Sequence, residues 1–545
     1  MSGRRTAAAI LAAASLTACG GGARSVPPQR GAAPAARVRV ALTMHWPARP
    51  QSARRRPSFV SPSAASVIVE VNPDASVPGP ITFGNAPAGG GTSTVAIDAP
   101  PGADVFFISL YDQPQTPGET ATAGNELGHV RLAQTIVANA TNTLNATVIG
   151  TVAAVRIGPL PNQPNVITQP PASPAAYELV GRTPATFAVA PLDAGGNVIL
   201  QPDAPPAITV AVNPRAAGLM SVTPVSGTTD QFTVQAVAPN STTYPTALVA
   251  TATDANGSIA TSSTVVDVTS AVYVAYANNG APSVARFDPH GNVLALAPGA
   301  FPGLMNPVAC AYDPDDRTIF VADAGAGKVL AFDEDGAARA GFSAPATAGV
   351  NGVTYDAHDG NVYASDGAGV TIFAPGGGPP RGGGPSAFGA PNAQGIAFVD
   401  SALNQPLDEL AVGDASSPRL GLYAESGSAA GGAALNAAPV AVAYGWPVAS
   451  NFNQSPQTRA QLYVTIAGGV AALDPFGTSI ASAANGGVPF GIAVDPNTRE
   501  PVVTERSGNA VTTYLDDLSA VDQARSFRTP SSLSLTQPQG VCHVF

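Results

Sequence analysis

Apolar and polar residues alternate in short runs from Arg37 to about Gly150. The runs include "RVRVAL", "SVIVEV", "STVAIDAP" and "DVFFISLYD", and Pro, Gly, Asn or Asp bounds each of them. Alternation over four to eight residues places every second side chain on one face of a strand, and the bounding residues favour turns. Residues 37–150 are therefore predicted to form an antiparallel β-sandwich.

The alternation continues through residues 151–270, in "TFAVAPLDAGGNVIL", "AITVAVNP" and "QFTVQAV". "DAGGN" and "TDANG" supply hairpin turns, because Gly and Asn tolerate positive φ. A second β-sandwich is predicted here. Both sandwiches are expected to be immunoglobulin-like, although the first lacks the cysteine pair and core tryptophan of antibody domains. The second resembles the bacterial Ig-like domains that act as spacers along surface proteins.

The polar residues of the first sandwich do not suggest a site. His45, Glu126 and His129 show no metal-ligand spacing. Trp46 is expected in the core, and both sandwiches are interpreted as spacers.

A repeat fills residues 271–545. Six segments align: "PVACAYDP", "VNGVTYDA", "AQGIAFVD", "PVAVAYGW", "PFGIAVDP" and "PQGVCHVF". A small residue recurs at one position of each, namely Ala309, Gly352, Gly395, Ala441, Gly491 and Gly540. A repeat of about 40 to 50 residues is typical of propellers and solenoids.

The segments that follow predict the strands of one blade per repeat. "RTIFVADA" and "KVLAFDEDG" after the first segment have counterparts in the next four repeats, and a weaker fourth strand is expected in the Gly-, Ala- and Pro-rich stretches. The recurring small residue would let the inner strands crowd around a central channel.

The two ends of the repeat region complete one another. Residues 271–294 fit the second and third strands of a blade that lacks its first strand, and "PQGVCHVF" is a first strand with no second. Joined, they make a blade closed by strand exchange, which removes the exposed edges of an open ring. About six blades are expected.

The stretch "PVACAYDPDDRTIFVADAGAGKVLAFDEDG" carries a family resemblance. It is similar to the NHL repeat of six-bladed β-propellers, whose units run roughly P-x-G-[IV]-A-x-D, [IL]-Y-V-A-D and [KR]-V-x-x-[FY]-D-x-x-G. The resemblance covers about half of the chain. It implies an all-β propeller, a fold that serves both binding proteins and enzymes.

Metal-dependent gluconolactonases are enzymes of similar strand pattern, and they hold their metal at the channel mouth with one Glu, two Asn and one Asp. The matching positions here are Asn306, Asn351, Gln394, Phe490 and Gln539. They lack the carboxylates that retain a hard cation. The sequence therefore predicts no channel metal, and the five residues become candidates for ligand binding at the mouth.

Acidic turns such as "YDPDDR", "FDEDG" and "YDAHDGN" are interpreted as β-turns between blade strands. A peripheral calcium ion bound by such a turn is the alternative. The five histidines lie far apart in sequence, and no Gly-x-Ser-x-Gly elbow supports a catalytic triad.

Cys310 and Cys542 fall on inner strands of neighbouring blades. A disulfide between them would fasten the ring, and an exported compartment would permit it. However, the two cysteines are one residue out of step in the repeat, which predicts side chains on opposite faces of a blade and argues against the bond.

Composition and charge narrow the classes of partner that the chain is expected to bind. Charged residues make up 11% of the 545 residues, and the net charge is -11. An acidic chain without a basic stripe gives no electrostatic footprint for nucleic acid. The single basic cluster, Arg54–Arg56, is interpreted as a solvated loop.

The N-terminal residues "MSGRRTAAAILAAASLTACGGG" resemble a lipoprotein signal peptide. Basic residues precede an apolar run of about a dozen residues, which is too short for a permanent membrane helix. "LTAC" resembles the bacterial lipobox, which implies cleavage before Cys19 and lipidation of that cysteine. Residues 1–19 are thus the predicted signal, and residues 20–36 the flexible tether. Gly20 after the cysteine favours the outer membrane or cell surface.

Together these features predict an exported, lipid-anchored surface protein whose propeller binds a protein or glycan, with no cofactor. Two alternatives remain open. One is a degenerate lactonase-like or lyase-like enzyme, and the other is a purely structural surface protein.

Overall fold

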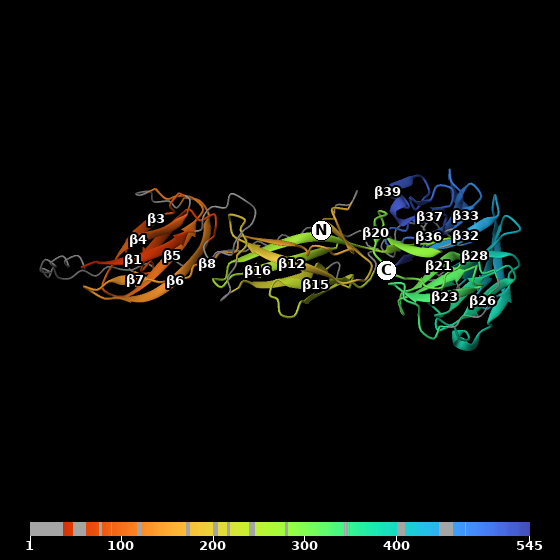
Figure 1. Ribbon diagram of the computed structural model, residues 1–545, viewed down its shortest axis with the longest axis horizontal. Helices are drawn as coiled ribbons and strands as arrows, with labels where there is room; N and C mark the ends of the chain where they lie inside the picture. The colour runs from red at the N-terminus through yellow and green to blue at the C-terminus, as the bar shows by residue number, and fades with distance from the viewer. Residues whose placement is uncertain are drawn as a thin grey trace, which may run out of the picture.

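The computed structural model shows an elongated all-β molecule (Figure 1). It describes residues 36–46, 61–75, 79–88, 90–116, 123–170, 175–199, 205–214, 218–238, 246–277, 282–342, 344, 347, 349–399, 409–445, 461–474 and 476–545. The predicted signal, Cys19, nearly all of the tether and the Arg54–Arg56 cluster lie outside these residues. Among the described residues, the helical elements are short 3-10 turns such as η2 (Arg381–Gly383) and η4 (Ser531–Leu533). No helix there has the length and apolar character needed to cross a membrane.

The first sandwich packs two sheets on one core. One sheet has the order β4 (Gly91–Ala99), β1 (Val38–Trp46), β7 (Asn142–Leu144); the other has the order β3 (Ile81–Asn85), β2 (Ser66–Val71), β5 (Gly102–Tyr111), β6 (Glu126–Ile136), β8 (Ile149–Gly150). Buried and exposed residues alternate along β1, as the sequence pattern predicts. Trp46 is 4% exposed and belongs to the core, as expected.

The second sandwich has the same plan. Its sheets have the orders β10 (Val166–Thr168), β11 (Tyr177–Val180), β17 (Ile259–Thr269), β16 (Ala247–Thr253), β13 (Ala207–Val212) and β14 (Met220–Pro224), β15 (Gln231–Ala236), β12 (Ala185–Leu192), β9 (Ala154–Pro159). Strict alternation along β12 buries Phe187 and Val189 between the sheets.

The C-terminal half forms six radially arranged sheets, which we number as blades in chain order. Blades 1 to 3 are β21 (Pro307–Asp313), β22 (Thr318–Asp323), β23 (Lys328–Asp333); β24 (Gly352–Tyr355), β25 (Val362–Ser365), β26 (Gly369–Phe373), β27 (Ala387–Gly389); and β28 (Ala393–Val399), β29 (Glu409–Asp414), β30 (Arg419–Ala424), β31 (Ala429–Ala434). Blades 4 and 5 are β32 (Pro439–Gly445), β33 (Gln461–Ile466), β34 (Gly469–Leu473), β35 (Ser479–Ala484); and β36 (Pro489–Val494), β37 (Pro501–Glu505), β38 (Ala510–Tyr514), β39 (Val521–Arg528).

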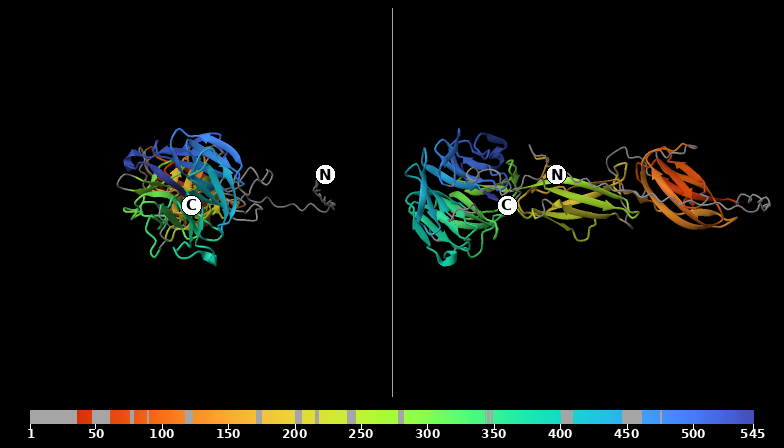
Figure 2. Two further views of the ribbon diagram at one scale, coloured as in Figure 1. Left: turned by 90° about the vertical axis from the view of Figure 1, so that its right-hand side faces the viewer. Right: turned by 180° about the vertical axis from the view of Figure 1, so that it is seen from behind.

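Blade 6 combines the two ends of the propeller region. Its strand order is β20 (Val293–Leu294), β19 (Ser283–Phe287), β18 (Ala271–Tyr276), β40 (Pro538–Val544). The antiparallel pairing of β18 with β40 confirms the predicted strand exchange. The end-on view in Figure 2 shows the blades around a centre, with the C-terminus of the chain near it.

A disulfide joins Cys310 of blade 1 to Cys542 of blade 6, with 5.6 Å between the Cα atoms. The expectation that opposite orientations would keep the two cysteines apart is wrong. Neighbouring blades pack face to face, so the two surfaces in contact are opposite faces of the repeat unit. Side chains one residue out of step therefore meet between blades, and both cysteines lie in the apolar core shared by blades 6 and 1.

Polar contacts join the two sandwiches. The Ser61 hydroxyl donates to Asp193, and the Asn197 amide donates to Ser63 Oγ at 2.8 Å. Asp193 and Asn197 are both less than 7% exposed, so this joint is partly excluded from water.

The second sandwich is docked on the propeller more extensively. Phe545, which follows β40, inserts into the core of the second sandwich, and the Arg182 guanidinium lies 5.4 Å from the centre of its ring. Arg182 Nη1 also donates to the carbonyl of Pro314 in blade 1 at 3.1 Å. These contacts fix the propeller to one end of the second sandwich.

A buried ion pair reinforces this junction. His290 Nε2 of blade 6 lies 2.9 Å from Glu178 Oε2 of β11, with side-chain exposures of 5% and 1%. Burial lowers the pKa of His290, but its bonds to Glu178 and to the Ala524 carbonyl outweigh burial and hold the pKa above its ordinary value.

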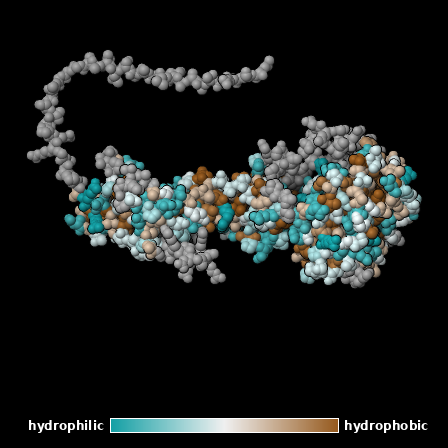
Figure 3. Space-filling model, turned by 90° about the horizontal axis from the view of Figure 1, so that it is seen from above, coloured by the Kyte–Doolittle hydropathy of each residue, from teal (hydrophilic) through white to brown (hydrophobic). Residues whose placement is uncertain are grey.

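Hydrophilic and hydrophobic side chains are interspersed over the visible face of the propeller (Figure 3). Scattered apolar residues of this kind are normal on a protein surface. The visible face of the propeller therefore does not single out a binding surface.

Candidate functional site

The inner strands of the six blades crowd closely around the propeller axis. A Cβ atom built on Gly540 would lie 2.5 Å from Ala309 Cα, and one on Gly491 would lie 2.1 Å from the Gln539 carbonyl oxygen. Backbone atoms thus meet where the small residue recurs, which confirms the reason inferred for it. The small residues therefore set how closely neighbouring inner strands approach one another around the channel.

The channel contains a cavity of about 600 Å³. All six inner strands line it, together with Arg182 of the second sandwich and Phe545. Because Arg182 and Phe545 lie at the C-terminal ends of the inner strands, we call that end proximal. The opposite end, where the inner strands begin, is the distal mouth.

A set of half-buried rings, the aromatic belt, lines the proximal part of the cavity: Tyr312, Tyr355, Phe398 and Tyr444. These residues occupy one repeat position, which Val494 and His543 fill in blades 5 and 6. The recurring aromatic residue, preceded by Ala or Thr, was visible in the sequence but was not interpreted as a site.

Polar contacts fix parts of the belt. The Tyr312 hydroxyl lies 2.6 Å from Glu334 Oε1 and 2.8 Å from the Phe545 carbonyl oxygen. Burial raises the pKa of Tyr312 and of Tyr355, so both stay protonated at neutral pH. The belt therefore offers neutral aromatic surface with few free polar groups.

The five predicted mouth residues are only partly brought together. Gln539 Nε2 donates to Asn306 Oδ1 at 3.2 Å, and Arg506 Nη2 donates to Gln539 Oε1 at 2.5 Å. The Arg506 guanidinium also stacks on the Phe490 ring at 3.5 Å from its centre. Three of the candidates thus cluster around Arg506, which sequence reasoning missed because it follows β37, the second strand of blade 5, and does not precede an inner strand.

The other two candidates lie in neighbouring blades. Asn351 lines the cavity and donates to the Ala393 carbonyl at 3.4 Å, and Gln394 is half-buried on β28. In the repeat alignment Asn351 corresponds to Val308, not to Asn306, which precedes β21. Of the five candidates, Asn351 and Phe490 line the cavity.

The mouth does not bring carboxylates together for a lactonase-like metal. Among the cavity-lining residues described, the carboxylate is Asp315, at the proximal end. Asp323 near the mouth is fully buried, and its oxygens accept the backbone N–H groups of Met305, Asn306 and Ala326. The arrangement therefore lacks the ligand set that such an enzyme needs.

Carboxylates do converge elsewhere. Asp356, Asp359 and Glu425 place ligand atoms within 4.8 Å of one another between blades 2 and 3. Burial, together with the neighbouring Asp359 and Glu425, raises the pKa of Asp356 to about 9. The turn containing Asp356 was predicted, but the approach of Glu425 from another blade was not.

Ser270, His543 and Asp495 also meet, although sequence reasoning found no support for a triad. Ser270 Oγ lies 2.9 Å from His543 Nδ1 and 3.3 Å from Asp495 Oδ1. Ser270 is fully buried and Asp495 is 2% exposed, so a substrate cannot reach the hydroxyl. Burial lowers the pKa of His543 and keeps the ring neutral. This cluster is a structural junction.

About half of the chain is similar in fold to known six-bladed β-propellers. A chain of a nidogen–laminin complex matches 50% of this chain and 98% of its own length, at 14% identity and a TM-score of 0.36. Streptogramin B lyase matches 50% of this chain and 80% of its own, at 13% identity and a TM-score of 0.32. Regucalcin, a calcium-binding protein from Agrobacterium tumefaciens, matches 44% and 77%, at 10% identity and a TM-score of 0.32.

No protein-family model matches the chain, and no curated protein matches it. The number of blades rests on the six sheets themselves.

Proposed function

We propose that this chain is an exported, lipid-anchored surface protein whose propeller binds a protein or glycan partner through its channel. The two sandwiches, as Ig-like spacers, would carry the propeller away from the membrane. The observation that supports binding best is the cavity of about 600 Å³ with its aromatic belt. Ligand sites of a few hundred cubic ångströms are typically apolar, with a few convergent polar groups.

The chemistry of the wall indicates what would bind. Flat neutral rings at Tyr355, Phe398 and Tyr444 favour the apolar face of a sugar or of a side chain. Arg182 and Asn351 supply polar contacts at the two ends. A terminal sugar of a glycan, or the end of a protein segment, has the size for such a cavity.

Phe398→Ala is expected to weaken ligand binding about tenfold or more, because aromatic anchors carry much of the energy of a binding site. Glycan and protein panels would identify the ligand, and calorimetry would give the Kd. Phe388→Ala is the matched control. Phe388 and Phe398 are both half-buried against the same core of blades 2 and 3, but Phe388 lies on β27, outside the channel. Equal affinities for the two variants, or no ligand in either panel, would argue against a channel site.

Cys19→Ser is expected to abolish lipidation. The wild-type chain, expressed in a bacterial host, should incorporate labelled palmitate and sediment with membranes, because several acyl chains on one residue give stable anchoring. The variant should do neither. Continued labelling of the variant would refute the anchor and leave the channel proposal standing.

A further inference from the structure

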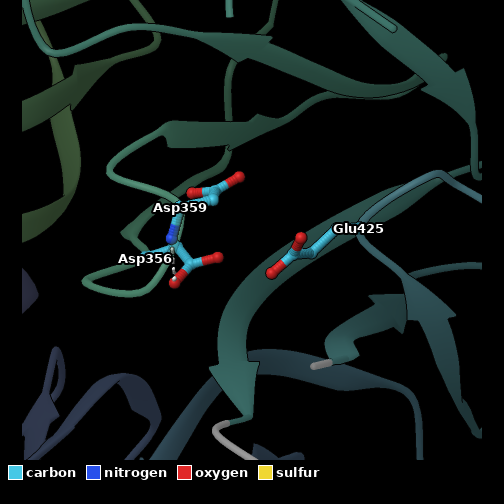
Figure 4. Close-up of side chains that lie close together, drawn as sticks. All are labelled: Asp356, Asp359 and Glu425. Carbon is cyan, nitrogen blue, oxygen red and sulfur yellow. Dashed lines mark hydrogen bonds between the residues drawn. The ribbon is translucent and has the colours of Figure 1, made fainter. Parts of the chain in front are cut away.

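Three carboxylates from two blades meet outside the channel. Asp356 and Asp359 lie in the turn after β24, and Glu425 lies in the turn after β30. Figure 4 shows the carboxyl groups of Asp356 and Glu425 pointing toward one another, with Asp359 beside them. Their ligand atoms lie within 4.8 Å of one another. The cluster thus bridges blade 2 and blade 3.

Hydrogen bonds within the turn satisfy only one of the two oxygens of the Asp356 carboxylate. Its Oδ1 accepts the backbone N–H of His358 at 2.7 Å and of Asp359 at 3.4 Å. Its Oδ2 has no hydrogen-bond donor among the described residues, and the whole Asp356 side chain is buried. Burial of a carboxyl oxygen without a donor disfavours the charged form, so a cation at this point would stabilise the carboxylate.

The equivalent position in blade 5 shows how such a carboxylate is otherwise satisfied. Asp495 of blade 5 also accepts a turn N–H, from Asn497 at 2.8 Å, but its Oδ2 faces the Arg525 guanidinium at 3.0 Å. Asp313 of blade 1 has the Tyr355 hydroxyl of the next blade as its neighbour, but its Oδ2, like that of Asp356, has no hydrogen-bond donor among the described residues. The corresponding residue next to Asp356 is Phe398, which has no hydroxyl, and the group facing Asp356 is the Glu425 carboxylate.

The turns that follow the third strands of the blades also differ in the partners of their glutamates. Glu334 of blade 1 is the counterpart of Glu425, and its oxygens accept from the Tyr312 hydroxyl and the Arg317 guanidinium. Glu334 of blade 1 and Asp495 of blade 5 thus each face a guanidinium. Between blades 2 and 3 the Asp356 carboxylate faces Glu425 instead. Glu425 Oε1 lies 3.7 Å from His358 Nδ1, and Asp359 Oδ2 accepts from the Tyr363 hydroxyl at 2.6 Å.

We propose that Asp356, Asp359 and Glu425 bind a calcium ion that ties blade 2 to blade 3. All three offer oxygen ligands, which hard divalent cations prefer, and calcium accepts irregular sets of carboxylates and waters. Calcium–oxygen distances are about 2.3 to 2.6 Å, so two ligands on opposite sides of one ion lie up to about 5 Å apart. The ligand atoms of the three carboxylates, which all lie within 4.8 Å of one another, fit within that limit. Magnesium demands near-ideal octahedral geometry at about 2.0 to 2.1 Å and keeps several waters, so an irregular set of carboxylates suits it less.

Calcium titration of the purified, chelator-treated full chain tests this site. We expect one calcium ion per chain, with a Kd of about 10⁻⁴ M, typical of extracellular modules, and a rise in the unfolding temperature of the propeller. Magnesium at the same concentration should produce a much smaller rise. The site is independent of the channel ligand, so the result does not depend on the proposed function.

Two variants locate the ion. Glu425→Gln should weaken calcium binding at least tenfold, yet remain as stable as the wild type without calcium, because the new amide can donate to Asp356 Oδ2. Asp335→Asn, in the equivalent turn of blade 1 and 81% exposed on its side chain, should bind calcium as the wild type does. Absence of a calcium-dependent shift in the wild type, equal effects of magnesium, or unchanged binding by Glu425→Gln would each overturn the proposal.

Discussion

A chain truncated after Gln537 is expected to lose cooperative unfolding of both the propeller and the second sandwich, while the first sandwich still unfolds as in the full chain. The deletion removes β40, the inner strand of blade 6. It leaves the β18 edge unpaired and removes the neighbour that β21 and β36 have in the ring. An open ring with unpaired edges is also prone to aggregate.

The same deletion damages the second sandwich, because Phe545 belongs to its core. Loss of a buried phenylalanine side chain typically costs about 3 to 5 kcal/mol, which is a large share of the stability of one domain. The core of the first sandwich contains no residue beyond Val148 among those described, so its transition serves as the internal control.

Scanning calorimetry of three chains separates these effects. Phe545→Ala should lower the transition of the second sandwich and change that of the propeller less, whereas truncation after Gln537 should abolish both. If the truncated chain melted at the same temperatures as the full chain, the closing role of β40 would be wrong. If Phe545→Ala left the second sandwich unchanged, the contact with its core would contribute little.

The double variant Cys310→Ala, Cys542→Ala is expected to destabilise the propeller by about 2 to 5 kcal/mol. The disulfide joins residues 232 positions apart, and a cross-link that closes so long a loop restricts the unfolded chain strongly. The two cysteines also fix β40 to β21, so the loss should fall on the same transition that truncation abolishes.

Denaturant unfolding with and without a reductant provides the control. Reduction should lower the midpoint of the wild-type protein to about that of the double variant and should leave the variant unchanged. A wild-type protein whose propeller midpoint is insensitive to reductant, with thiols titrating as free, would contradict the disulfide.

Much of the propeller could be predicted because its signals are local and repeated. The recurring small residue, the strand segments after it and the split blade all depend on strand periodicity, which a single chain displays directly. Strands such as β3, β9 and β14 were not among the segments singled out, since their apolar runs are short and weakly patterned.

The contacts that were missed depend on how blades and modules face one another. The faces presented by Cys310 and Cys542 follow from blade packing, as does the approach of Glu425 to Asp356. Arg506 was not predicted at the mouth because it follows a second strand, whereas the predicted mouth residues lie at or before the start of inner strands. Such contacts join residues distant in sequence, and periodicity within one strand carries no information about them.

Phe545 gives the molecule an order of assembly. Chains are made from the N-terminus, and domains commonly fold as they emerge. The first sandwich has all of its core residues early, but the second cannot complete its core until Phe545 has been synthesised, after the whole propeller. We therefore expect the second sandwich and the propeller to reach their native state together, once the contact of Phe545 with the sandwich core can form.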